Sequence, residues 1–112
     1  MDDDLETWLL DAGDAVIRKK GLAGHSSLEP LEQAIYSLWV VDYAVRNSGT
    51  LGPMHELYPQ ALQELRTFSR SSNLQALSML LQDSDNEAFF CGKYNNQFGA
   101  ACAELRQLRA RA

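Results

Sequence analysis

The sequence predicts an all-α protein, a compact bundle of five to seven helices packed around a buried central helix at about residues 30–47. Three observations support this fold class. Apolar residues recur at the three- and four-residue spacing of helices in several separate stretches. No stretch alternates polar and apolar residues as a strand does, and no Asn-Gly or Asp-Gly pair marks a hairpin turn. Residues 30–47 are apolar around almost the whole helix circumference, which is typical of a buried helix.

The length of 112 residues fits one all-helical domain, which we assign to residues 1–112. A hydrophobic content of 46% with 22% charged residues is normal for a globular protein and argues against a disordered chain. No apolar run approaches the roughly 18–20 residues that cross a membrane, and the three aspartates after Met1 are unlike the start of a signal peptide. We therefore expect a cytoplasmic protein with no membrane partner.

A first helix is expected from the acids near the N-terminus to about Lys20. Asp3 or Asp4 supplies an N-cap, and Leu5, Leu9 and Val16 fall on one face. Gly21 follows three basic residues and is the expected stop, so that residues 21–27 are predicted to form a loop.

The central helix has a start signal and a stop signal of its own. Pro30 lies in the first turn, where proline is tolerated best. Asn47-Ser48-Gly49 provides the C-terminal cap, with Gly49 or Asn47 available for a left-handed conformation.

Asp42 falls in the middle of the more apolar side of this helix. A buried carboxylate has to be paired or hydrogen-bonded, because isolated burial of a charge is very costly. Arg46 lies four residues later, so we predict a structural polar pair of Asp42 and Arg46. Backbone amides of a neighbouring loop are an alternative partner, and a binding or catalytic role is a further alternative.

The second half of the chain predicts several shorter helices. Pro53 begins the first, Pro59 the next, which runs to about Arg70, and residues 74–81 form a third. Ser84 and Glu87 have capping-box spacing and are expected to start a helical turn. We expect Gly92 to interrupt that turn, and a last helix to run from Asn95 or Asn96 to about Arg109.

The net charge of −5 comes from one end of the chain. Residues 1–14 hold six acids and no base, whereas the remaining 98 residues hold nine acids and ten bases. The candidate partner-binding residues are therefore Asp2, Asp3, Asp4, Glu6, Asp11 and Asp14. They form either an exposed acidic face with no special role or a surface that binds a basic partner. Direct binding of nucleic acid is not expected, because no basic stripe is present to neutralise phosphates.

Catalytic and metal-binding patterns are missing from the sequence. His55-Glu56 begins like a zinc-protease helix, but Pro59 occupies the position of the second histidine. Cys91 and Cys102 have no metal-ligand spacing and are expected to be free thiols in the interior. We expect no catalytic residue, no metal and no cofactor. If the chain were an enzyme of unrecognised type, Asp42, His55 and Tyr36 would be the nearest acid–base groups.

The central stretch also carries a resemblance. Pro30, Glu32, Gln33, Ala34, Ile35 and Tyr36, followed by Trp39, Val41, Asp42, Val45, Asn47 and Gly49, fit a recurring pattern. Within residues 30–49 the chain resembles a family of all-helical bacterial domains of unknown function, one member of which is a dimeric DNA-mimic protein. The resemblance implies a helical bacterial-type protein, and it implies a DNA mimic or a dimer as functional alternatives.

Together these observations favour a non-enzymatic protein-interaction module whose partner is another protein, with a homodimer as one form. The alternative is a DNA mimic, or an immunity or antitoxin-like protein, that uses the acidic residues 2–14 against a basic partner. The aromatic residues Trp8, Tyr36, Trp39 and Tyr43 are expected to serve core or dimer packing, with Trp39 and Tyr43 on one flank of the central helix.

Overall fold

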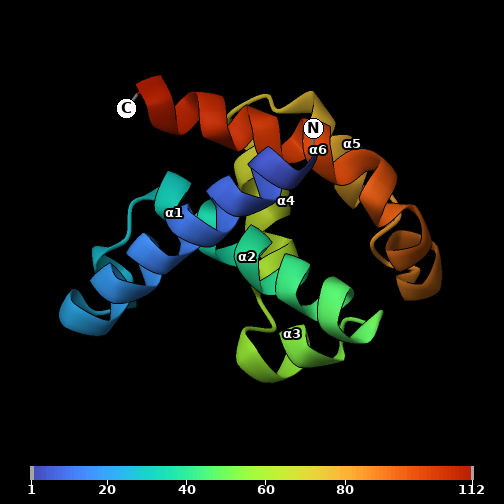
Figure 1. Cartoon of the computed structure of the whole chain (residues 1–112), viewed down its shortest axis with the longest axis horizontal. Coiled ribbons are helices and arrows are strands. Elements are labelled where there is room, and N and C mark those ends of the chain that lie inside the picture. Colours follow the sequence, from blue (N-terminus) through green and yellow to red (C-terminus); the bar gives the residue numbers. More distant parts are fainter. Residues whose placement is uncertain (1, 112) are drawn as a thin grey trace.

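The structure is a computed structural model that describes residues 2–111, and the side chains of residues 4–111. Its helices are α1 (Asp2–Ala23), α2 (Pro30–Ser48), α3 (Gly52–Leu57), α4 (Ala61–Ser71), α5 (Gln75–Leu81) and α6 (Glu87–Arg111), with a 3-10 turn at His25–Ser27. The part of the chain that the structure describes contains no strand. The predicted all-α bundle is therefore confirmed, with six α-helices arranged as in Figure 1.

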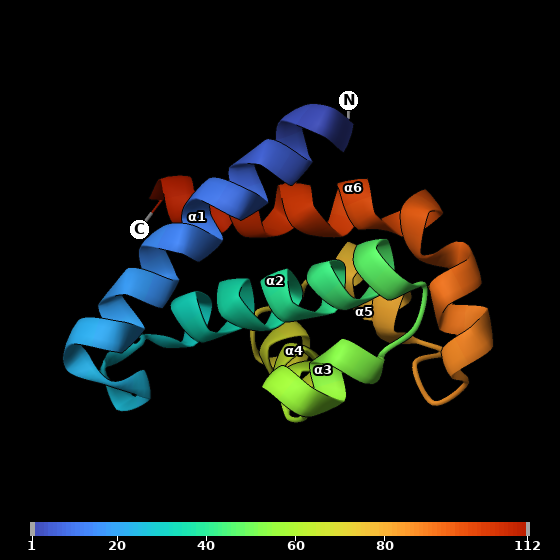
Figure 2. The same cartoon turned by 60° about the horizontal axis from the view of Figure 1, so that its bottom comes forward.

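Helix α2 is the centre of the bundle. It lies between α1 and α6 on one side and α3 and α4 on the other, and it contacts all four (Figure 2). Ile35, Leu38 and Val41 are fully buried. The predicted ends are observed: Pro30 occupies the first turn, and Gly49 has a φ of 70° while its N–H bonds to Val45 O at 2.9 Å. Proline is tolerated in the first turn of a helix, and a glycine in the left-handed conformation ends one.

Helices α1 and α2 approach closely where Gly13 meets Trp39. A Cβ atom placed on Gly13 would lie 2.5 Å from Trp39 Cδ1, well inside van der Waals contact. The two helices can therefore keep this distance only because residue 13 has no side chain. Trp39 is fixed between α1 and its aromatic neighbours on α2, Tyr36 before it and Tyr43 after it.

Helix α5 has only seven residues, and α6 holds its N-terminus. The carboxylate of Glu104, on α6, accepts hydrogen bonds from the backbone N–H of Ala76 at 3.1 Å and of Leu77 at 2.8 Å. A carboxylate at this end of a helix satisfies free N–H groups and complements the helix dipole. The contact joins α5 to the second half of α6, which turns partway along its length in Figure 2.

Three predicted boundaries were wrong. Helix α1 continues past Gly21 to Ala23 and ends before Gly24, whose φ is 87°. Helix α6 is continuous through Gly92, because packing against α5 outweighs the weak helix propensity of one glycine. Its cap is Asn86, whose side-chain oxygen accepts the N–H of Phe89 at 3.1 Å, while Ser84 instead receives a hydrogen bond from Arg66.

None of the described helices combines the length and the apolar character that a membrane span requires.

Candidate functional site

The predicted pair of Asp42 and Arg46 lies at the junction of α2 and α6. Asp42 is only 4% exposed, and its Oδ1 atom accepts a hydrogen bond from Arg46 Nε at 2.7 Å. The same oxygen accepts a second hydrogen bond, at 2.8 Å, from the hydroxyl of Tyr94 on α6. Two side chains, one from α2 and one from α6, therefore share the buried carboxylate of Asp42, and no loop amide takes part among the contacts of the described residues.

The charges in this cluster compensate one another. Burial raises the pKa of Tyr94 well above its ordinary value of 10.0, and the neighbouring carboxylate of Asp42 raises it further. Burial alone would lower the pKa of Arg46, but the carboxylates of Asp42 and Glu6 outweigh it and raise that pKa. Tyr94 thus remains a neutral donor and Arg46 a cation, which is the combination that stabilises a buried carboxylate.

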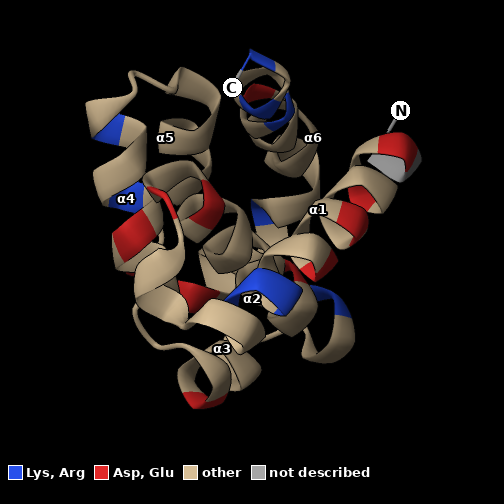
Figure 3. Ribbon diagram, turned by 90° about the vertical axis from the view of Figure 1, so that its left-hand side faces the viewer, with Lys and Arg blue, Asp and Glu red and all other residues tan. Residues whose placement is uncertain are grey.

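Among the acids of the N-terminal segment, the four whose side chains the structure describes do not form one uniform surface. Asp4, Asp11 and Asp14 are exposed, and Asp14 pairs with Arg18 at 3.0 Å. Glu6 turns towards α2 and lies 3.6 Å from the guanidinium of Arg46. The side chains of Asp2 and Asp3 lie outside the described part of the chain. Figure 3 shows the acidic positions along the N-terminal half of α1.

A cavity of about 210 Å³ opens between α1 and α2 beside these acids. We call four of its lining residues, Glu6, Leu10, Trp39 and Tyr43, the α1–α2 face. The buried Asp42 and the exposed Arg46 and Asn47 also line the cavity. Leu10 is 51% exposed and Tyr43 43% exposed, although both are large and apolar for most of their surface. The rings of Trp39 and Tyr43 stack with centroids 5.8 Å apart and an angle of 12°. The flank that the sequence predicted for these two residues is thus partly open to solvent.

A second polar cluster was missed by the sequence analysis. Tyr58 donates a hydrogen bond to Glu64 Oε1, Ser37 donates to Glu64 Oε2 at 3.2 Å, and His25 Nε2 lies 3.1 Å from Tyr58 Oη. Lys20 donates to Tyr36 Oη at 3.1 Å beside them. The two members of a contacting pair are separated by as many as 33 positions in the sequence. No local spacing could therefore have revealed the cluster.

The hydrogen positions in this cluster are constrained by the donors available. Tyr58 has one hydroxyl proton, which it gives to Glu64, so Nε2 of His25 has to be the donor in its contact with Tyr58. Burial raises the pKa of Tyr58, and its hydrogen bond to Glu64 adds to the effect, so the hydroxyl keeps that proton. The cluster joins the last part of α1, the 3-10 turn, α2, the end of α3 and α4. Nδ1 of His25 is buried and has no hydrogen-bond partner among the described residues.

The remaining candidate residues are scattered. His55 Nε2 lies 3.9 Å from Glu87, whereas Asp42 bonds to Arg46 and Tyr94, and Tyr36 bonds to Lys20. These three acid–base candidates therefore have separate polar partners. Cys102 is buried, and burial raises the pKa of the half-buried Cys91. Within the residues that the structure describes, no group of three or more histidine, cysteine, aspartate or glutamate side chains is arranged to hold a metal ion.

No family model matches the chain, and searches of curated proteins and of solved structures return no match either. The surfaces and side-chain clusters described above are therefore the basis for inferring function.

Proposed function

We propose that this chain is a non-enzymatic protein-interaction module and that it binds a protein partner through the α1–α2 face. The observation that carries the proposal is the exposure of Leu10 and Tyr43 around a cavity of about 210 Å³. Aromatic side chains are enriched at the centres of protein interfaces, where they contribute most of the binding energy.

The face is held in a fixed shape before any partner arrives. Trp39 is in contact with Gly13 on one side and stacks on Tyr43 on the other. Tyr43 is therefore restrained by its neighbour, and less conformational entropy is lost when a partner covers it. The cavity has apolar walls at Leu10, Trp39 and Tyr43, against which an apolar side chain of the partner would pack.

Charge indicates what surrounds that apolar side chain. Asp4 and Asp11 are exposed on the helix that carries Leu10, and Glu6 lines the cavity itself. A partner with basic residues around an apolar anchor would complement this arrangement, and its association rate would fall as salt is added. A homodimer through the same face would place two copies of α1 near each other and is disfavoured by their like charges.

The test compares three baits, the unchanged chain and two variants, in affinity capture followed by quantitative mass spectrometry. The double variant Leu10→Ser with Tyr43→Ser should lose the partner that the unchanged chain retains. Leu57→Ser is the matched control, because Leu57 is also 51% exposed but lies on α3. Loss of the same protein from both variant baits, or from neither, would contradict the assignment of this face.

The DNA-mimic alternative makes a different prediction for the same captured partner. A mimic would compete with duplex DNA, and the competition would disappear when Asp4, Asp11 and Asp14 are replaced by asparagine. The interaction module requires Leu10 and Tyr43 instead. Competition that depends on the three aspartates and is unaffected by the Leu10 and Tyr43 changes would favour the mimic.

A further inference from the structure

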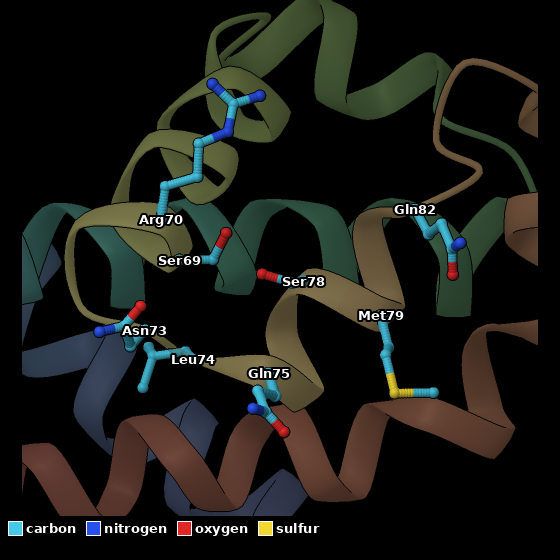
Figure 4. Close-up of a pocket in the computed structure, with 8 residues that line it drawn as sticks. All are labelled: Ser69, Arg70, Asn73, Leu74, Gln75, Ser78, Met79 and Gln82. Atoms are coloured by element: carbon cyan, nitrogen blue, oxygen red, sulfur yellow. The ribbon is translucent and has the colours of Figure 1, made fainter.

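A cavity on another surface lies between α4 and α5. It has a volume of about 720 Å³ and is open to solvent along one side. We call it the α4–α5 groove, and Figure 4 shows the side chains that line it. In Figure 3, α4 and α1 lie at opposite sides of the molecule, so the groove is separate from the α1–α2 face.

The groove is lined mainly by hydrogen-bonding side chains that the protein leaves available. Within residues 4–111, the side chains of five lining residues make no hydrogen bond or ion pair with other protein groups: Arg70, Asn73, Gln75, Ser78 and Gln82. Ser69 is only 3% exposed, and its hydroxyl donates to Arg66 O at 2.9 Å. Its oxygen can still accept a hydrogen bond from a ligand, because a hydroxyl has two lone pairs. Ser69 and Ser78 extend towards each other across the groove in Figure 4.

Arg70 gives the groove its charge preference. Arg66, one turn earlier on α4, already donates hydrogen bonds to Ser84 and, at 3.1 Å, to Asp85. Arg70 has no such carboxylate among the described residues, so its guanidinium is free to form the paired hydrogen bonds that favour a carboxylate. Met79, 55% exposed at the far end, offers an adaptable apolar contact.

This combination fits a polypeptide better than a small molecule or a nucleic acid. Pockets for small ligands are mostly apolar and aromatic, whereas this groove has no aromatic lining residue. Nucleic acid would require several free cations, whereas Arg70 is the one cation among the residues that line the groove. Side-chain amides such as those of Asn73, Gln75 and Gln82 each supply donors and an acceptor, which match the alternating N–H and C=O groups of an extended backbone.

We propose that the α4–α5 groove binds an extended acidic peptide segment of a partner protein. Arg70 pairs with a carboxylate of the segment, the amide side chains bond to its backbone, and Met79 contacts an apolar residue. This is a second binding function, on a different surface and of opposite charge preference from the α1–α2 face.

The test uses the full chain labelled with ¹⁵N and titrated with one defined probe. The probe is an acetylated and amidated hexapeptide of alternating aspartate and leucine, and its asparagine–leucine counterpart is the uncharged control. We expect chemical-shift changes confined to residues 69–82, with at least fivefold weaker binding of the control peptide. Changes centred on Leu10 and Tyr43, or no saturable change, would overturn the proposal.

Two variants separate the proposed contacts from general charge effects. Arg70→Gln should weaken binding of the aspartate peptide at least fivefold. Ser78→Gln places a longer side chain of α5 in the groove and should also weaken binding of the peptide. Arg18→Gln is the matched control, because it removes one exposed cation from α1 and should leave affinity unchanged. Equal effects of Arg18→Gln and Arg70→Gln would mean that only net charge matters. Because both groove variants alter exposed side chains, unchanged circular-dichroism spectra verify that each is folded.

Discussion

At the scale of single residues, Asp42 has the most demanding environment in the described structure. It is almost completely buried, and its Oδ1 atom serves both Arg46 and Tyr94. Asp42→Ala should lower the free energy of unfolding by about 2–4 kcal/mol, because it leaves the Tyr94 hydroxyl buried without its acceptor and Arg46 without its closest anion. Urea denaturation followed by circular dichroism measures this change.

Two comparisons make this prediction specific to the cluster. Asp42→Asn retains an oxygen acceptor and should cost less, about 1–2 kcal/mol. Asp14→Asn breaks an exposed pair with Arg18 on α1 and should change stability by no more than about 0.5 kcal/mol. A loss as large for Asp14→Asn as for Asp42→Ala would show that general charge, and not the buried cluster, determines stability.

The same residues show which side-chain contacts can be predicted from the sequence alone. The four-residue spacing on one helix was enough to predict that Asp42 and Arg46 are close, because i and i+4 side chains are neighbours on a helix. Tyr94 is 52 residues away from Asp42, and only the packing of α6 on α2 brings its hydroxyl to the carboxylate. Tyr58 and Glu64 could not be predicted to meet His25 for the same reason.

At the scale of helices, the crossing of α1 and α2 depends on Gly13. Gly13→Ala should lower the free energy of unfolding by about 1–2 kcal/mol, because the new methyl group overlaps Trp39 and the cost of overpacking exceeds the gain in helix propensity. Gly21→Ala is the matched change on the same helix. Gly21 has open space around it, so the substitution should raise stability by up to about 1 kcal/mol. Opposite shifts in melting temperature for the two variants are expected; shifts of the same sign would contradict the close approach.

The helices themselves could be predicted well, but their boundaries less well. Apolar spacing identified most of the segments that are helical, Pro53 indicated the short α3, and Pro30 and Gly49 marked the ends of α2 because their backbone requirements are local. Gly21 and Gly92 did not mark helix ends as predicted. A glycine with ordinary helical dihedrals lowers helix stability by only about 1 kcal/mol, and contacts with other helices offset this loss. The exposure of Leu10 and Tyr43 could not be predicted either, since it depends on how two helices cross.

At the scale of the whole molecule, the buried tyrosines link stability to alkaline pH. The unfolded chain releases the proton of Tyr94 near pH 10, whereas the folded chain retains it to higher pH because burial and Asp42 raise its pKa. The unfolded state therefore binds fewer protons above that pH, and stability must fall as the pH rises further. Tyr58, whose pKa is also raised, contributes in the same direction.

Tyr94→Phe tests this linkage, because it removes the titrating hydroxyl and keeps the ring. Unfolding free energies measured by urea denaturation from pH 8 to pH 11 should fall less steeply in the variant than in the unchanged chain. Tyr43→Phe provides the control, since Tyr43 is exposed and should leave the slope unchanged. Identical slopes for all three chains would rule out the buried hydroxyl as the source of the pH dependence.

The carboxylate of Glu104 at the start of α5 has a consequence for how the chain folds. Seven residues are too few to form a stable helix in water, because the cost of the first turn is not recovered over so short a length. The first N–H groups of α5 donate their hydrogen bonds to a carboxylate 27–28 positions later, so α5 can become ordered only once α6 is in place. Helices α5 and α6 should therefore form one cooperative folding unit, and the α4–α5 groove should exist only after the last part of the chain has folded.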